Sequence, residues 1–238
     1  MPQPKLSKKE LKEDEFLSAF EKVTRYASLH AKSFTFAAIV LVLLIVGFIG
    51  ARIYFERYEA RASLALFAAD QSYRENVALI SEDNPMERKG MPDFEKPLKL
   101  YQEVVRLFPR SDSAQQALYQ SAQCHYRLSK YQDAIAAFQK YLQGNPRGKF
   151  SVLAGLGLGY CFEQEGQYDK ALAAYATAID GNPDDPLIGE AFVSSGRCQE
   201  MAGKKEDAIS TYTQVVERFP NSSWKADAER KLLFLRSQ

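Results

Sequence analysis

The sequence predicts an all-α protein in which stacked helical hairpins follow one N-terminal membrane-spanning helix. Two observations carry this prediction. Residues 33–51 contain no charged side chain. Further along the chain, prolines recur every 37 residues, at Pro109, Pro146, Pro183 and Pro220. A fixed period of roughly 20 to 50 residues is typical of proteins that stack one small supersecondary unit.

The composition is that of a globular protein rather than a disordered or fibrous one. The 238 residues are 46% hydrophobic and 26% charged, with a formal net charge of +1. This balance argues against nucleic acid as a partner, which requires a concentrated basic face. Three cysteines do not suffice for the disulfide framework of a small secreted domain.

The uncharged stretch 33–51 is long enough to cross a bilayer. As a helix it rises by roughly 28 Å, close to the hydrocarbon thickness of about 30 Å. Tyr54 and Phe55 follow it, as in an interfacial aromatic belt. We therefore predict a transmembrane helix over 33–55, which contacts the lipid bilayer. A cleaved signal peptide is the weaker alternative, because the preceding leader is long, contains acids, and no Ala-x-Ala site follows.

Residues 1–32 are expected to form a cytoplasmic amphipathic leader. They hold more Lys and Arg than the stretch that follows the span, which favours a cytoplasmic N-terminus. Ser7 and Glu10 fit a capping box at the start of a leader helix. The body of the chain would then lie in the periplasm of a bacterium.

The repeats show the same order of residues in each unit: a small residue, an alanine, an aromatic residue and the proline. The three columns ahead of the proline are Ala122, Gly159 and Gly196; Ala134, Ala171 and Ala208; and Phe138, Tyr175 and Tyr212. A small residue permits close helix approach, the aromatic fills the space between units, and proline ends the second helix. Ser129-Lys130, Gly166-Gln167 and Gly203-Lys204 are the expected turns between the first helix (A) and second helix (B) of each unit.

This pattern resembles the tetratricopeptide repeat, although the period is 37 rather than 34 residues. The resemblance implies a right-handed helical-hairpin solenoid whose A helices line a concave face. The predicted segments are 56–109, a divergent first repeat with an inserted loop at 81–93; 110–146, 147–183 and 184–220, three full repeats; and 221–238, a capping helix. The first helix A is expected at about Glu59–Ile80.

Two chemical motifs are better explained by packing. Cys124, Cys161 and Cys198 share one repeat column, and equivalent positions on neighbouring helices lie too far apart for a disulfide or a shared metal ion. We expect a buried small-residue column. The run Gly155-Leu-Gly157-Leu-Gly159 lies inside a helix A, where its glycines would serve helix packing rather than phosphate binding. We therefore predict no catalytic site, no metal site and no cofactor.

The tetratricopeptide resemblance implies that partner proteins or peptides bind along the concave face. The groove columns are Gln116, Tyr119, Gln123 and Tyr126 in the first full repeat; Leu156, Tyr160 and Glu163 in the second; and Glu190, Arg197 and Glu200 in the third. Only Arg197 is cationic in this set, which disfavours the family's carboxylate clamp.

The layout of one N-terminal span and a repeat domain resembles a group of bacterial inner-membrane proteins that includes an ancillary subunit of the protein-export translocon. It implies a scaffold that binds partners or clients at the inner membrane, in protein export or periplasmic chaperoning. A second function class is a structural or coordinating component of cell-envelope assembly or cell division that self-associates as a homo-oligomer. The endings RLFPRS and ERFPNS also resemble envelope-assembly lipoproteins, but no cysteine follows the apolar segment closely enough to carry a lipid.

Overall fold

The computed structural model describes residues 31–81 and 91–237, and this part of the chain is helical, without a strand. The predicted leader and the predicted loop at 81–93 lie largely outside the described residues. The chain divides into two compact units, residues 1–57 and residues 58–238. Each is described by itself below.

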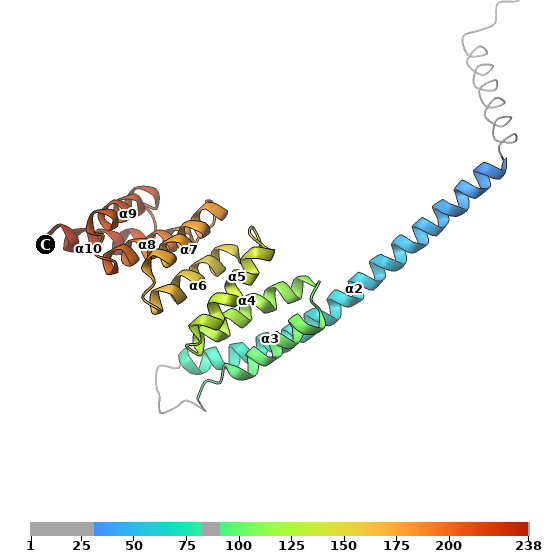
Figure 1. The fold of residues 1–238 in the computed structure, drawn as a ribbon, viewed down its shortest axis with the longest axis horizontal. Coiled ribbons are helices and arrows are strands. Elements are labelled where there is room, and N and C mark those ends of the chain that lie inside the picture. Colours follow the sequence, from blue (N-terminus) through green and yellow to red (C-terminus); the bar gives the residue numbers. More distant parts are fainter. Residues whose placement is uncertain (1–30, 82–90, 238) are drawn as a thin grey trace, which may run out of the picture. The chain divides into compact units, whose positions relative to one another are not determined.

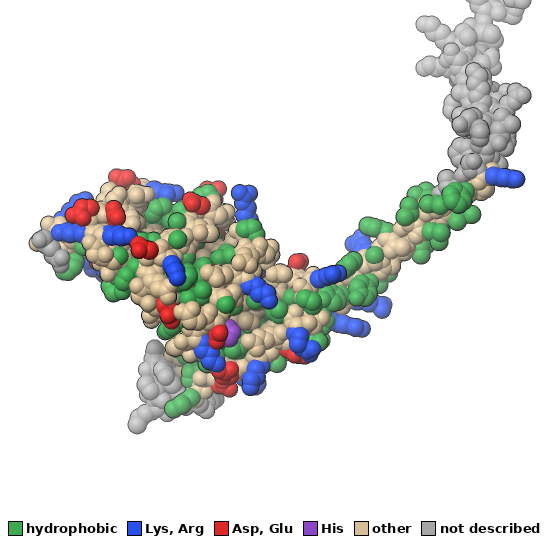
Figure 2. Space-filling view, viewed as in Figure 1, with side chains coloured by type: hydrophobic (Ala, Val, Ile, Leu, Met, Phe, Trp, Pro, Cys, Tyr) green, Lys and Arg blue, Asp and Glu red, His purple; other side chains and the backbone are tan. Residues whose placement is uncertain are grey.

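The described part of the first unit is the N-terminal portion of helix α2 (Ala31–Ser81), which continues into the second unit. By length and composition, α2 is the one described helix that qualifies as a membrane span. In the portion of α2 before residue 58 the described apolar side chains are exposed; Leu44, for example, is 66% exposed. Hydrophobic groups cover this portion in the space-filling view (Figure 2). Such a helix suits a hydrocarbon environment rather than a protein core.

The second unit is a solenoid of helix pairs that follow one another along the chain (Figure 1). The A helices of the full repeats are α4 (Asp112–Arg127), α6 (Ser151–Gln164) and α8 (Ile188–Met201). The B helices are α3 (Glu95–Leu107), α5 (Tyr131–Gly144), α7 (Tyr168–Gly181) and α9 (Lys205–Arg218), and the last helix is α10 (Ser223–Ser237).

From α3 onward each helix packs on the next one, and each A helix from α4 onward also contacts the following A helix. The side formed by α4, α6, α8 and α10 is called the A-helix face below. The all-α repeat solenoid predicted from the 37-residue period is therefore confirmed.

The repeat columns explain the local geometry. Each of the four spaced prolines stands two residues after the end of a B helix, for example Pro146 after Gly144. Gly166 and Gly203 have φ values of 69° and 72°, and Ser129 has a φ of 58°. The predicted A-to-B turns are confirmed, because a left-handed residue ends each of these A helices.

The aromatic column forms the centre of the core. Phe138, Tyr175 and Tyr212 are fully buried, and Tyr101 extends the column one period upstream. A Cβ on Gly159 would lie 2.1 Å from Cε1 of Tyr175. The predicted packing role of this glycine is confirmed, because a larger residue would displace the ring.

The part of α2 that follows residue 58 packs against the start of the solenoid. Ala62, Leu66 and Ala69 are buried, and the latter two share a core cluster with Leu98 and Tyr101. At its N-terminus, α4 is capped by a side chain of α2: Oε2 of Glu59 accepts from Asp112 N–H at 3.0 Å. Oε1 of Glu59 accepts from the backbone N–H and hydroxyl of Ser113. A carboxylate suits this position because the first N–H groups of a helix lack partners within it.

Candidate protein-binding face

A tyrosine–carboxylate hydrogen bond links helix B to helix A in successive units. Tyr175 donates to Oε1 of Glu163 at 2.6 Å, and Tyr212 donates to Oε1 of Glu200. Both acids are groove residues predicted from the sequence. Each acid therefore holds its own repeat together as well as facing solvent.

Two units depart from this pair in an informative way. In the divergent first repeat Tyr101 donates to Asp70 of α2 at 2.7 Å, so α2 supplies the acid. In the first full repeat the aromatic residue is Phe138, which has no hydroxyl. The position equivalent to Glu163 holds Tyr126 there. The carboxylate is thus present where a tyrosine can donate to it, and absent where none can.

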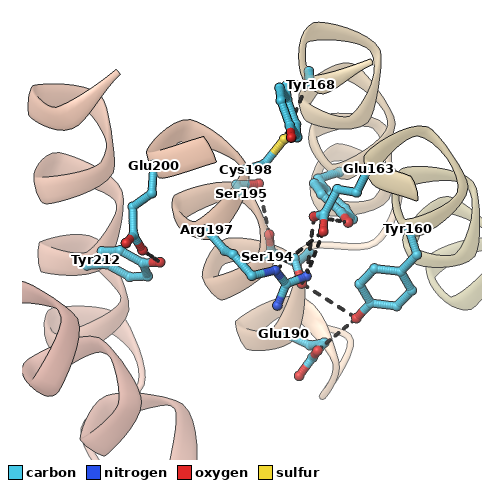
Figure 3. A network of polar contacts seen from close by, with 12 residues as sticks. Tyr160, Glu163, Tyr168, Glu190, Ser194, Ser195, Arg197, Cys198, Glu200 and Tyr212 are labelled. Carbon is cyan, nitrogen blue, oxygen red and sulfur yellow. Dashed lines mark hydrogen bonds and ion pairs between the residues drawn. The ribbon is translucent and has the colours of Figure 1, made fainter. Parts of the chain in front are cut away.

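A second set of contacts joins successive A helices across the A-helix face. Tyr160 of α6 donates to Oε1 of Glu190 at 2.7 Å, and Trp224 Nε1 donates to Oε2 of the same carboxylate at 3.1 Å. Figure 3 shows Tyr160 pointing at Glu190 from the neighbouring helix. One carboxylate therefore bridges α6, α8 and α10.

Ion pairs complete this network. Arg197 lies 3.2 Å from Glu163, and Lys231 lies 3.0 Å from Glu200. The Arg197 guanidinium also lies 5.9 Å from the centre of the Tyr160 ring (Figure 3). The structure thus brings four predicted groove residues together in connected pairs: Tyr160, Glu163, Glu190 and Arg197. Glu200 instead pairs with Tyr212 and Lys231, which are not predicted groove residues. Most of the polar groups of these groove residues form hydrogen bonds or ion pairs within the solenoid.

The tyrosines in this network are neutral donors. Burial raises the pKa of Tyr160, and burial together with the hydrogen bond to Glu163 raises the pKa of Tyr175. Both hydroxyls therefore keep their protons at any physiological pH. In this part of the face the two tyrosine hydroxyls are therefore permanent hydrogen-bond donors to carboxylates.

The cysteine column is inert, as expected from its place in the repeats. Cys124, Cys161 and Cys198 are free and buried. Burial raises the pKa of the Cys124 and Cys161 thiols to about 12 and that of Cys198 to about 11. Thiols that hold their protons are poor nucleophiles and poor metal ligands. No group of three metal-ligating side chains occurs within the described residues.

The groove residues of α4 are arranged differently from those of α6 and α8. Gln116 donates to Asp70 at 3.3 Å, and Gln123 donates to the hydroxyl of Tyr119 at 2.8 Å. Tyr119 is buried and stacks on Phe150, with the ring centres 4.8 Å apart. Leu156 of α6 is also buried. Tyr119 and Leu156 therefore pack in the core under the A-helix face and expose little surface to a partner.

A cleft of about 510 Å³ opens beside these α4 residues, between α2, α4 and the start of α6. Leu66, Tyr141 and Phe150 supply its apolar lining, and Gln115, Gln116 and Lys149 its polar lining. The 37-residue columns predicted only Gln116 here. Gln115 and Tyr141 lie beside the predicted columns on α4 and α5. Leu66 comes from α2, and Lys149 and Phe150 come from the loop between α5 and α6; neither segment follows the regular spacing.

The comparisons with known proteins agree with this architecture. The family model described as "YfiO: Outer membrane lipoprotein" matches residues 90–238, which is more than half of the chain. The chain belongs to the YfiO family. A search of curated proteins finds no match.

Solved structures show the same fold at low sequence identity. MamA is 18% identical with a TM-score of 0.52, covering 61% of this chain and 78% of MamA. The MamA RS-1 ArsTM double mutant is 19% identical with a TM-score of 0.55, covering 74% and 83%. Kinesin light chain TPR-like repeats from Podosopora anserina are 12% identical with a TM-score of 0.56, covering 75% and 87%. These similarities establish a tetratricopeptide-type fold for this YfiO family chain.

Proposed function

We propose that this chain is a membrane-anchored scaffold that holds partner or client proteins at the bacterial inner membrane. The observation that carries the proposal is the combination of a span-length apolar helix with a YfiO-type repeat solenoid in one sequence. Repeat solenoids of this kind present extended concave surfaces to other proteins. The groove residues of the A-helix face are the proposed contact area, and no enzymatic activity is assigned to it.

The mode of anchoring distinguishes this chain from the lipoprotein description of its family. All three cysteines in the sequence are buried in α4, α6 and α8, where they are inaccessible to a lipid. Residues 33–55 of α2 offer an apolar segment instead. We propose that this segment spans the inner membrane, with the N-terminus in the cytoplasm and the repeats in the periplasm. An ancillary role in protein export or periplasmic chaperoning follows from that placement.

Site-specific photo-crosslinking in living cells tests the scaffold. A photoreactive residue replaces Tyr160 on the A-helix face, and the control replaces Lys170, which is exposed beside Phe162. Crosslinks from position 160 to exported chaperones or translocon subunits are expected, with few from position 170. Crosslinks to cytoplasmic proteins would reverse the proposed topology. Equal products from both positions would contradict a partner surface on the A-helix face.

Exposed apolar residues at the two ends of the solenoid favour a second candidate, self-association in an envelope assembly. Leu64 and Phe67 on α2 are 72% and 57% exposed, and Leu233 and Phe234 on α10 are 74% and 56% exposed. Leu64→Cys and Leu233→Cys each place one accessible thiol in a chain whose native thiols are buried. Rapid disulfide-linked dimers in intact membranes would support self-association. Monomers under oxidising conditions for both variants would rule out contacts in which either end meets the same end of a second copy.

A further inference from the structure

We propose that the cleft between α2, α4 and the start of α6 binds an extended segment of a partner protein, in which an apolar side chain is followed by acidic residues. This inference rests on the proposed scaffold function, because it states where and by what chemistry the scaffold grips a partner. It is carried by the shape of the cleft, by unused hydrogen-bonding groups and by an asymmetry of charge.

The cleft has a preformed apolar floor. Leu66 and Tyr141 are buried, and Phe150 stacks on Tyr119 with its ring plane 3° from parallel. The hydroxyl of Tyr141 accepts the Phe150 N–H at 3.1 Å, which fixes the start of α6. A volume of about 510 Å³ suits one or two side chains. A whole helix, about 10 Å across, would not enter it.

Two amide side chains line the cleft with unused groups. Gln115 Oε1 accepts from Asn145 at 2.7 Å, and Gln116 Nε2 donates to Asp70. Within the described part of the chain, the NH₂ group of Gln115 and the carbonyl of Gln116 have no hydrogen-bond partner. These two groups are complementary to the C=O and N–H of an extended peptide backbone. A partner segment with its backbone exposed would satisfy both.

The charges around the cleft are asymmetric. On the α6 side, Lys149 and the nearby Arg147 form no ion pair with any described residue, and Lys149 Nζ lies 5.3 Å from the centre of the Phe150 ring. On the opposite side lie the two acids of the cleft lining, Glu59 and Asp112: both oxygens of Glu59 accept from the N-terminus of α4, and Asp112 is in the first turn of that helix. Both carboxylates therefore lie at a helix N-terminus, which favours negative charge, whereas the two cations have no ion-pair partner among the described residues. An acidic segment leaving the cleft towards Lys149 would pair with them.

The rest of the face does not offer this combination. Arg197 and Lys231 are already paired with Glu163 and Glu200. The cleft beside α4, by contrast, combines cationic, amide and aromatic groups that have no ion-pair or hydrogen-bond partner for part of their capacity among the described residues.

Peptide binding to the full chain in lipid nanodiscs tests the inference. One fluorescein-labelled peptide of about nine residues carries a central phenylalanine followed by two glutamates, and a matched peptide carries two lysines instead. The glutamate peptide is expected to bind at least tenfold more tightly, about 1.4 kcal/mol. Lys149→Glu, at an exposed position, should reverse this preference. Ser63→Trp, which fills the cleft from α2, should weaken both peptides at least tenfold.

Matched controls lie away from the cleft. Lys140→Glu and Ser210→Trp make the same changes at exposed positions of α5 and α9 and should leave binding unchanged. Circular dichroism checks that each variant keeps its helicity. Equal affinity for the two peptides, or binding that neither Ser63→Trp nor Lys149→Glu alters, would overturn the proposal.

The same variants separate this inference from the scaffold function. Partners that crosslink to position 160 in cells, together with no peptide binding at the cleft, would leave the scaffold standing and remove the cleft as its contact. Peptide binding at the cleft with no crosslinked protein from position 149 or 160 would retain the cleft and contradict the scaffold. A crosslink from position 149 to a second copy would replace the acidic segment with self-association.

Discussion

The Tyr175 hydroxyl donates a hydrogen bond to Oε1 of Glu163, 2.6 Å away, and so joins helix B of one repeat to its own helix A. The same carboxylate lies 3.2 Å from Arg197 of the next repeat. Glu163 therefore acts both within a repeat and between repeats. Because both contacts of this predicted groove acid are made within the solenoid, its main role is to stabilise the fold.

Tyr175→Phe should lower the free energy of unfolding by about 1.5 to 3 kcal/mol, the usual value of a hydrogen bond to a charged group. The ring stays in place, so the loss reports the hydroxyl alone. Urea unfolding followed by circular dichroism measures it. Tyr131→Phe is the control, because that hydroxyl has no hydrogen-bond partner among the described residues. Equal stability of the two variants would mean that the Glu163 bond contributes nothing.

The regular part of this architecture follows from the sequence because each repeat obeys the same steric rules. A proline two residues past each B helix, a left-handed turn residue and a small residue facing an aromatic ring recur at one spacing. Tyr175 and Glu163 are separated by 12 residues, and so are Tyr212 and Glu200. The tyrosine–carboxylate pair could therefore have been found from two columns with that offset.

The irregular part could not be predicted in this way. Asp70 accepts the hydrogen bond of Tyr101 although it lies 31 residues upstream, because an insertion separates α2 from α3. Glu59 caps α4 across 53 residues, and no local pattern marks that contact. The cleft lining combines this displaced helix with the loop before Phe150. The 37-residue period predicts only the residues that stand in repeat columns, and these side chains stand outside those columns.

Gly159→Ala should destabilise the solenoid by about 1 to 3 kcal/mol despite the better helix propensity of alanine. The new methyl group would lie 2.1 Å from the ring of Tyr175, so this fully buried ring would have to shift. Gly144→Ala is the matched control, since its nearest neighbour is 4.0 Å away. The control should be neutral or slightly stabilising in the same urea titration. Similar effects for both variants would argue against the close packing at residue 159.

His125 should make the first full repeat sensitive to acid. It occupies the column of Phe162 and Gln199, and its Nδ1 is buried without a hydrogen-bond partner among the described residues, 3.9 Å from Asp133. Burial lowers the pKa of His125 below 6.5; Lys130 lowers it further, while Asp133 and Glu95 oppose the shift. The unfolded chain therefore binds the proton more readily. Stability is full above about pH 6.5 and falls as the pH drops through the folded pKa.

Thermal unfolding at a series of pH values checks this prediction. His125→Phe, which gives this repeat the side chain that Phe162 supplies in the next one, should lose less stability than the wild type between about pH 7 and pH 5. His125→Gln, which matches Gln199, should do the same without the added ring. The other histidine, His30, is unchanged in all three proteins. Parallel pH profiles for the wild type and both variants would mean that protonation of His125 does not lower the stability of the fold.

Gly189→Ala should detach the capping helix α10 and be visible in the fluorescence of Trp224, the single tryptophan of the chain. A Cβ at residue 189 would lie 2.0 Å from Cε3 of the indole, so the ring must leave its place against α8. The bond from Trp224 to Glu190 would then be lost, and the indole would enter water. We expect a red-shifted emission maximum under native conditions and earlier unfolding by fluorescence than by circular dichroism. Glu190→Gln keeps the ring packed and should shift the emission much less. An unchanged spectrum in Gly189→Ala would mean that the indole does not pack against this glycine.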